Sequence, residues 1–298
     1  MKKILLGKTN QEVPSIVVGC MRLSGLTNSE MNTFIHHAID NGAYYFDHAD
    51  IYGGGMSEEV FGKAFAGDSS LKREEVIIQS KCGIKNTAQY PHYDLSKESI
   101  IKSVEGSLTR LKTDYLDALL LHRPDALLDP CEIAEAFDEL SSSGKVRSFG
   151  VSNFNPMQIE LLKKYVKHPL IANQLQFSIA VSNMVSSGME VNMTSDGAYM
   201  RDGSVLDYCR LNDMTIQAWS PFQMPNWRGC FIDSDEYPEL NAVLSEFKKL
   251  DDILAYNQYK VLKAFQENRI SDMHFGWNSG YGYDDPGRDA IENVYKDV

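Results

Sequence analysis

Short apolar runs alternate with longer helical segments from the start of the chain to about residue 220. The apolar runs occupy residues 44–47, 76–80, 117–121, 146–152, 171–175 and 215–220. The predicted helices lie near residues 29–42, 58–66, 97–112, 131–143, 156–167 and 204–212. Strands this short and this apolar are typical of a sheet buried on both faces, and their alternation with helices predicts parallel strands joined by helical crossovers.

Chain length and alternation together predict an α/β fold of the (β/α)8 TIM-barrel type. The 298 residues are enough for such a barrel, which typically takes about 250 residues plus insertions. Residues 4–6 and 15–19 flank the turn-like GKTNQ, which predicts an N-terminal β-hairpin on the barrel floor, with 15–19 as the first barrel strand. Seven strands are complete by Trp219, so the barrel is predicted to be incomplete at its eighth β/α unit.

Four polar residues lie near the C-terminal ends of apolar runs: Asp47, Tyr52, Lys81 and His122. In a parallel barrel the carboxyl ends of the strands converge on one face, so these residues are expected to be neighbours. A tyrosine with a reference pKa of about 10 is a poor acid unless a cation such as Lys81 stabilises its phenolate. With Asp47 paired to the lysine and His122 orienting a carbonyl oxygen, the set predicts a proton-donating site for carbonyl reduction.

Each residue of this set also has an ordinary structural interpretation. A lysine after a strand is commonly a solvated strand end, and a histidine there is commonly a satisfied core residue. Tyr52 is then a half-buried aromatic residue, and Asp47 a loop or helix cap. The catalytic interpretation is favoured because it accounts for all four residues together.

The motifs FDHADIYG, VIIQSKCG and LLLHRPD, in this order, resemble those of the aldo-keto reductase family. The resemblance implies that Asp47, Tyr52, Lys81 and His122 are the catalytic tetrad. It also implies reduction of an aldehyde or ketone to an alcohol with NADPH, or NADH, as cofactor. No GxGxxG follows a strand and no GxxxxGK[ST] occurs, so neither a Rossmann dinucleotide site nor a P-loop is predicted.

Further strand-end motifs, SFGVSNF, NQLQFS and QAWSPF, are similar to cofactor-binding segments of that family. The resemblance implies that Ser152, Asn153 and Gln174 bind the nicotinamide carboxamide, that Trp219 stacks on the ring and that Ser220 contacts the pyrophosphate. It also places the segment GCMRL, with Met21 and Arg22, near the cofactor. Without the resemblance, Trp219 is interpreted as a core tryptophan.

The composition is acidic, because 29 basic and 41 acidic residues give a net charge of −12. This balance argues against nucleic acid or a membrane as the main partner. The aldo-keto reductase resemblance implies a small-molecule carbonyl substrate as the partner. Five widely spaced cysteines form no CxxC pair, so reduced thiols and no metal site are expected. The short apolar stretch in MKKILLGK is too small for a signal sequence, which predicts a cytoplasmic protein.

The aldo-keto reductase resemblance covers about residues 1–245, so the predicted domains are a barrel over 1–246 and an atypical tail over 247–298. The tail contains SGYGYDDPGRD at residues 279–289. With this motif it is similar to the amino-terminal segment of pyridoxal-phosphate lyases of the methionine gamma-lyase or aluminium-resistance family. That second resemblance implies cofactor-phosphate contacts at Tyr281, Tyr283 and Arg288. Residues 250–268 are predicted to form an amphipathic helix, followed by a poorly ordered glycine-rich segment. A divergent C-terminal extension of the barrel is the alternative.

Two other functions compete with carbonyl reduction. One is a cofactor-binding protein without catalysis, against which the intact Tyr52 and Lys81 argue. The other is an impaired fusion product with a lyase-derived tail, which the missing eighth strand favours. The sequence leaves open the substrate, the choice between NADPH and NADH, and the oligomeric state.

Overall fold

A computed structural model describes residues 1–86, 91–190, 193–194, 203–224, 229–231, 234–236 and 238. The chain divides into two compact units, Met1–Pro221 and Phe222–Val298. All helices and strands given below lie in the first unit. The predicted helix at 250–268, the glycine-rich segment and the lyase-like residues Tyr281, Tyr283 and Arg288 lie outside the described residues, as does the proposed boundary at 246.

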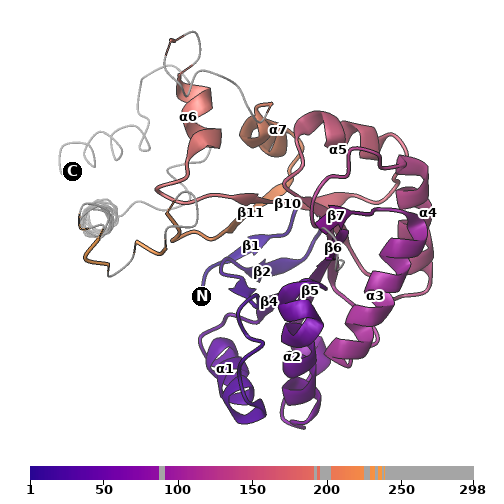
Figure 1. The fold of residues 1–298 in the computed structure, drawn as a ribbon, viewed down its shortest axis with the longest axis vertical. Helices are drawn as coiled ribbons and strands as arrows, with labels where there is room; N and C mark the ends of the chain where they lie inside the picture. Colours follow the sequence, from indigo (N-terminus) through magenta and orange to yellow (C-terminus); the bar gives the residue numbers. More distant parts are fainter. Residues whose placement is uncertain are drawn as a thin grey trace, which may run out of the picture. The chain divides into compact units, whose positions relative to one another are not determined.

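The first unit is built on a curved sheet of seven parallel strands, ordered β11-β10-β9-β8-β5-β4-β3 (Figure 1). The strands are β3 (Val18–Gly19), β4 (Tyr45–Asp47), β5 (Ile77–Cys82), β8 (Ala118–Leu121), β9 (Phe149–Ser152), β10 (Leu170–Gln176) and β11 (Thr215–Trp219). All seven lie in or overlap the predicted apolar runs. Among the described residues, β3 and β11 are the edges of this sheet.

Helices pack along the outer face of the curved sheet, except that α6 lies apart from the others, beside α7 (Figure 1). They are α1 (Asn28–Asp40), α2 (Met56–Ala66), α3 (Lys97–Leu111), α4 (Pro130–Ser142), α5 (Pro156–Lys163), α6 (Asn183–Met189) and α7 (Val205–Leu211), with 3-10 turns η1 (Tyr52–Gly55) and η2 (Arg73–Glu75). The six predicted helices are confirmed, although α5 ends at Lys163 instead of 167. Helix α6 was not predicted, because its sequence NMVSSGM carries no helical apolar stripe.

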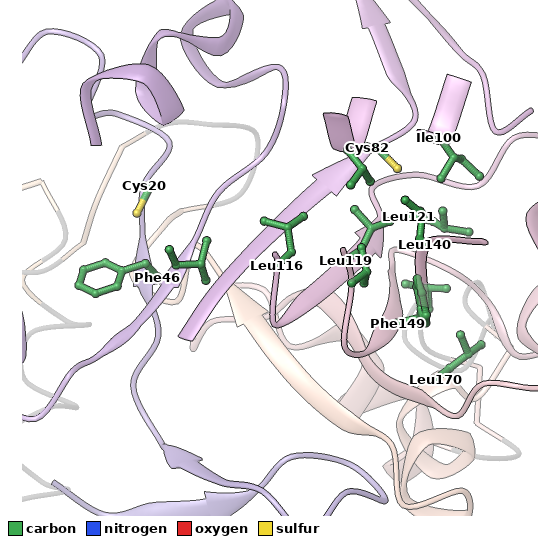
Figure 2. Close-up of a cluster of buried hydrophobic side chains, with 14 of the residues drawn as sticks. Cys20, Phe46, Cys82, Ile100, Leu116, Leu119, Leu121, Leu140, Phe149 and Leu170 are labelled. Carbon is green, nitrogen blue, oxygen red and sulfur yellow. The ribbon is translucent and has the colours of Figure 1, made fainter. Parts of the chain in front are cut away.

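The main core lies between the sheet and these helices (Figure 2). Leu119 and Leu121 of β8 and Phe149 of β9 point into it, and each is at most 1% exposed. Phe149 stacks on Phe137 of α4 with ring centroids 4.0 Å apart. Burial of such side chains, worth about 1.5–3 kcal/mol each, fixes the helices against the strands that carry the polar residues.

An antiparallel hairpin, β1 (Lys3–Leu5) and β2 (Glu12–Pro14), confirms the predicted N-terminal hairpin. Leu6 and Val13, at this hairpin, pack in a second apolar cluster against strand residues of the sheet. We call this cluster the floor; its other buried members are Tyr45, Ile77, Ala118, Ile171 and Ala172. A second hairpin, β6 (Ile84–Asn86) with β7 (Pro91–Tyr93), was not predicted.

All five cysteines are free, as their spacing predicts. In the described part of the chain, no helix is both long and apolar enough to cross a bilayer.

Candidate active site

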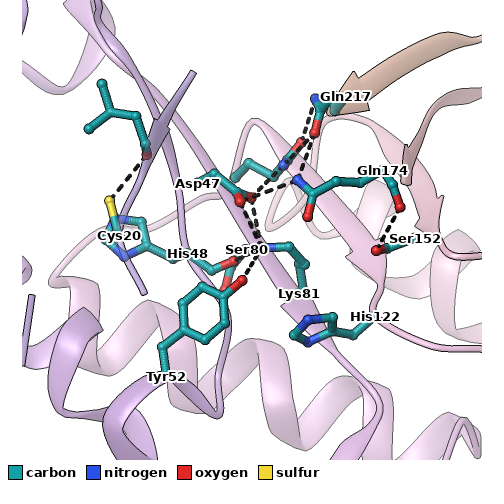
Figure 3. A network of polar contacts seen from close by, with 12 residues as sticks. Cys20, Asp47, His48, Tyr52, Ser80, Lys81, His122, Ser152, Gln174 and Gln217 are labelled. Atoms are coloured by element: carbon teal, nitrogen blue, oxygen red, sulfur yellow. Dashed lines mark hydrogen bonds and ion pairs between the residues drawn. The ribbon is translucent and has the colours of Figure 1, made fainter. Parts of the chain in front are cut away.

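Lys81, on the fully buried strand β5, is the centre of the site (Figure 3). Its Nζ lies 2.8 and 2.9 Å from the two carboxylate oxygens of Asp47 and 3.1 Å from the Tyr52 hydroxyl. It also donates to the backbone carbonyl of His48 at 2.7 Å. A buried ammonium is tolerated only with such partners, because an unpaired charge away from water is costly. Three of the four predicted catalytic residues therefore meet at one atom.

The turn after β4 brings Tyr52 back to Lys81. Gly53, Gly54 and Gly55 all have positive φ angles, of 59°, 66° and 95°. At Gly53 a Cβ atom would lie 2.7 Å from the Ser24 Cβ, so this close approach requires glycine. The three glycines thus allow the sharp turn that sets Tyr52 between the end of β4 and the start of α2.

Ser57 lies in the first turn of α2 but does not cap the helix. The N-cap residue of α2 is Gly55, and no side chain caps the helix. The Ser57 hydroxyl instead donates to the backbone carbonyl of Met21 at 3.3 Å. Ser57 therefore links α2 to the loop after β3.

His122 follows β8 and faces Tyr52. Its backbone N–H donates to the carbonyl of Cys82 at 2.8 Å, which continues the pairing of β8 with β5. The two rings meet edge to face, with centroids 5.9 Å apart and planes at 82°. The structure thus brings all four predicted catalytic residues together. The Nδ1 atom of His122 is buried and has no hydrogen-bond partner among the described residues.

The two basic members of the site, His122 and Lys81, differ in charge at physiological pH. Burial, together with the nearby Lys81 and Arg123, lowers the pKa of His122 to about 3, so the imidazole is neutral at physiological pH. Burial also acts to lower the pKa of Lys81, but Asp47 and Tyr52 outweigh it and hold that pKa above its ordinary value. The site therefore combines a permanent ammonium with a neutral imidazole.

The pKa of Tyr52 differs from the sequence-based expectation. Burial raises it, Lys81 lowers it and Asp47 raises it, and the net result lies above the ordinary value. The predicted contribution of Lys81 has the right sign, but the burial of the phenol and the neighbouring carboxylate outweigh it. Tyr52 consequently keeps its proton at neutral pH, which is the state that a proton donor requires.

A network of glutamine side chains holds Asp47 from the side opposite to Tyr52 (Figure 3). Gln79 Nε2 donates to Asp47 Oδ1 at 2.6 Å, and Gln174 Nε2 donates to Asp47 Oδ2 at 3.2 Å. Both amides also donate to Gln217 Oε1, at 2.9 and 3.0 Å. Sequence reasoning missed Gln79 and Gln217. Their sequence positions could have revealed them. Gln79 lies two residues before Lys81, and Gln217 two residues before Trp219, so each pair is on the same side of its strand.

Three of the predicted cofactor-binding residues also lie together, beside His122. Asn153 Nδ2 donates to Ser152 Oγ at 2.8 Å and to the His122 carbonyl at 3.3 Å. The indole N–H of Trp219 donates to Asn153 Oδ1 at 3.2 Å. A carboxamide offers one acceptor and two donors, and a hydroxyl beside an amide complements it. Ser152 and Asn153 therefore form one hydrogen-bonded group, with the half-buried Trp219 ring next to it.

The other predicted cofactor residues are placed differently. The amide of Gln174 is engaged by Asp47 and Gln217, so its direct contacts are with the acidic side of the site. Met21 is 52% exposed and Arg22 is exposed, both in the loop after β3. Ser220 follows Trp219 directly and is half-buried, with a positive φ of 50°.

The model of the aldo/keto reductase family matches residues 15–269. The uncharacterized oxidoreductase YcsN of Bacillus subtilis is 39% identical over 229 residues, which cover 74% of this chain and 70% of that protein. The oxidoreductase YdhF of Escherichia coli is 43% identical over 184 residues, covering 60% and 61%. Among solved structures, the holo form of an aldo-keto reductase from Bacillus halodurans superposes with a TM-score of 0.59 at 27% identity, covering 72% and 65%.

With a parallel sheet of this kind and a family match over most of its length, the chain belongs to the aldo/keto reductase family. It is an oxidoreductase with the (β/α)8 barrel fold of that family, of which seven strands are described. The match continues to residue 269, past the limit of about 245 that the motifs suggest. The chain spans 61% to 70% of the length of these two curated relatives.

Proposed function

We propose that the protein reduces an aldehyde or ketone to an alcohol with NADPH, or alternatively NADH, as cofactor. The observation that carries the proposal is the contact of the Lys81 ammonium with both the Tyr52 hydroxyl and the Asp47 carboxylate in a buried site. A phenol fixed beside a cation is a proton donor whose conjugate base is stabilised where it forms.

Each member of the tetrad has a distinct role in this proposal. Tyr52 donates its hydroxyl proton to the carbonyl oxygen, and the Lys81 ammonium 3.1 Å away stabilises the phenolate that remains. Asp47 keeps Lys81 charged and in place. Neutral His122, edge-on to Tyr52, orients the carbonyl oxygen through a ring N–H. The bound nicotinamide supplies the hydride that reaches the carbonyl carbon.

Ser152, Asn153 and Trp219 are proposed to hold the nicotinamide next to the tetrad. Asn153 contacts both the Trp219 indole and the His122 carbonyl, so it couples the cofactor position to the tetrad. Gln174 is proposed to act indirectly, by donating a hydrogen bond that holds Asp47 in position. Ser220, Met21 and Arg22 remain proposed contacts of the pyrophosphate and the loop after β3.

For the whole chain we propose a barrel over residues 1–246 and a separate tail over 247–298 with the lyase-like sequence. The protein is proposed to act on small-molecule carbonyl compounds in the cytoplasm and to bind neither nucleic acid nor membranes. Weak cofactor binding and low thermal stability are the expected consequences of the atypical tail. Measurements of cofactor affinity and thermal stability therefore distinguish an impaired fusion product from a fully active reductase.

Two measurements test this function. Titration of NADPH and NADH against tryptophan fluorescence is expected to quench Trp219, because the proposed ring contact is direct. Consumption of NADPH with a panel of aldehydes and ketones is expected to exceed that of the Tyr52→Phe protein by about 10²–10⁴-fold. Cofactor binding with equal, background consumption by both proteins would instead identify a binding protein without catalysis.

A further inference from the structure

A cleft of about 650 Å³ lies outside the tetrad, where three segments meet. These are the turn around Tyr52, strand β6, and α3 with the residues just before it, and none of the four tetrad side chains lines the cleft. The volume falls in the range of small-molecule sites, about 300–1,000 Å³. Asp50 and Ile51, just before Tyr52, contribute to its wall.

The lining of this cleft carries both signs of charge. Its charged side chains are Asp50, Asp94, Glu98, Lys85, Lys102 and Arg110. Arg110 is already paired, 2.7 Å from the carboxylate of Glu58, which is fully buried behind it. Two lysines and three carboxylates then remain within one small space. With both signs of charge so close together, the lining offers hydrogen-bond donors and acceptors to a polar ligand that carries no net charge.

Two buried polar atoms in the lining have no hydrogen-bond partner in the part of the chain that the structure describes. They are Asp50 Oδ1 and Ser99 Oγ, and Ser99 is only 7% exposed. Leaving such atoms unpaired costs about 1–3 kcal/mol each, so each calls for an explanation. The Asp50 carboxylate oxygen can only accept a hydrogen bond, so it needs a donor, whereas the Ser99 hydroxyl can either donate or accept one.

The groups around Asp50 also indicate that its carboxylate lacks a hydrogen-bond donor. Burial raises the pKa of Asp50 to about 6, although Ser103 and Lys85 act to lower it. Lys85 Nζ donates to Ser103 Oγ at 2.9 Å, which holds the ammonium at the edge of the cleft with one of its three N–H groups engaged. A carboxylate that needs a donor therefore lies near an ammonium that can donate.

We propose that this cleft binds a neutral polyhydroxylated small molecule. One hydroxyl of a vicinal pair donates to Asp50 Oδ1, the other accepts from Lys85, and a third hydroxyl pairs with Ser99. Ile51 and Ile84, which also line the cleft, cover the C–H faces of such a molecule. The site is separate from the tetrad and does not depend on the proposed reduction.

The test uses the full chain with sorbitol as the probe and isoleucine δ1-methyl NMR as the readout. Sorbitol is expected to shift the methyl resonances of Ile51 and Ile84 in a saturable way, with a Kd of about 1–10 mM. The resonance of Ile133, buried in α4 away from the cleft, is expected to stay in place. Tyr52→Phe is expected to bind sorbitol like the parent, because its hydroxyl does not line the cleft.

Variants assign the binding to individual groups. Asp50→Asn and Lys85→Met are each expected to weaken sorbitol binding about tenfold, and Ser99→Ala a few-fold, because charge-assisted hydrogen bonds are the stronger ones. Lys63→Met is the matched control: it removes an exposed lysine with one ion pair on α2, and is expected to bind normally. An unchanged Ile133 resonance shows that each variant is folded.

Three results overturn the proposal. One is the absence of any sorbitol-induced shift at Ile51 and Ile84. Another is equal binding by the parent and all three cleft variants. The third is a response to an amino-acid zwitterion or to inorganic phosphate in place of sorbitol, which would assign the cleft to a charged ligand.

Discussion

The floor and the tetrad are two buried regions built on the same strands, but the floor is apolar and the tetrad is polar and charged. At the floor, Ile77 of β5 packs with Leu6, Val13 and Ala118 in an apolar cluster. Four residues along β5, Lys81 lies equally buried but surrounded by charges and amides. Apolar floor side chains need only fit one another, whereas each buried polar group in the tetrad needs a partner. Loss of a side chain at the floor should therefore cost stability alone, and loss at the tetrad should cost chemistry as well.

Lys81→Met should give the largest combined effect. It leaves the Asp47 carboxylate buried without its ammonium, which is expected to cost about 3–5 kcal/mol of unfolding free energy. It also removes the charge that lowers the pKa of Tyr52, so that pKa should rise further above its ordinary value and the kcat should fall at least about 10²-fold. Urea unfolding and steady-state kinetics measure the two effects.

The exposed pair Lys63–Glu59 is the control for that experiment. Lys63→Met should change the unfolding free energy by less than about 1 kcal/mol, because surface ion pairs contribute little. Equal behaviour of the two lysine variants would remove Lys81 from the account.

Tyr52→Phe should separate chemistry from stability. Lys81 keeps Asp47 and the His48 carbonyl as partners, so the unfolding free energy should stay within about 1 kcal/mol of the parent. The kcat should fall by about 10²–10⁴-fold, because the proton donor is lost, while cofactor affinity measured by tryptophan fluorescence stays the same. A variant that keeps more than about half of the parent kcat would contradict the assignment.

Ile77→Ala should show the reverse pattern. The floor loses a side chain that is only 6% exposed, at an expected cost of about 2–5 kcal/mol, while the milder Ile77→Val should cost about 0.5–1.5 kcal/mol. The kcat at a temperature where both variants are folded should stay close to the parent value. A kcat loss that grows with the stability loss would show that floor and tetrad are mechanically coupled.

His48→Leu should give the smallest effect, and one that depends on pH. His48 is fully buried beside Phe61, both ring nitrogens lack hydrogen-bond partners among the described residues, and burial lowers its pKa to about 3. Because the unfolded histidine titrates near about 6.5, its contribution to stability is present above that pH and is lost as the pH falls towards 3.

The variant lacks this titration, so its stability should exceed the parent's by about 2 kcal/mol more at pH 5 than at pH 7.5. Urea midpoints at the two pH values measure the difference. The pKa of His122 is also lowered to about 3, so in both proteins part of the dependence of stability on pH comes from His122. Parallel pH profiles would show that His48 finds a partner for its proton in the folded protein.

The sequence predicted the strands and the proximity of Asp47, Tyr52, Lys81 and His122 because both depend on one regular pattern. Apolar runs alternate with helices, and parallel strands bring residues at their carboxyl ends together whatever their separation along the chain. The glutamine network depends on strand register, which the pattern does not contain. Asp47 lies opposite Gln79, and Gln174 opposite Gln217, only because of the register that the folded sheet adopts.

Burial was the other quantity that local sequence could not supply. The phenol of Tyr52 was expected to be more acidic because of Lys81, but its pKa follows from how deeply the whole set is buried. The hairpin β6–β7, which helps to form the polar cleft, also escaped prediction, because its strands of three residues each carry no apolar alternation.

Deuterium transfer tests the central claim most directly. The parent protein, given NADPH with both hydrogens at nicotinamide C4 replaced by deuterium and an aldehyde, should yield an alcohol with one deuterium on the former carbonyl carbon, detected by mass spectrometry. Tyr52→Phe should bind the same cofactor equally well and yield about 10²–10⁴-fold less labelled alcohol in the same time. Labelled alcohol formed at equal rates by both proteins, or none formed by a parent that binds the cofactor, would contradict the account.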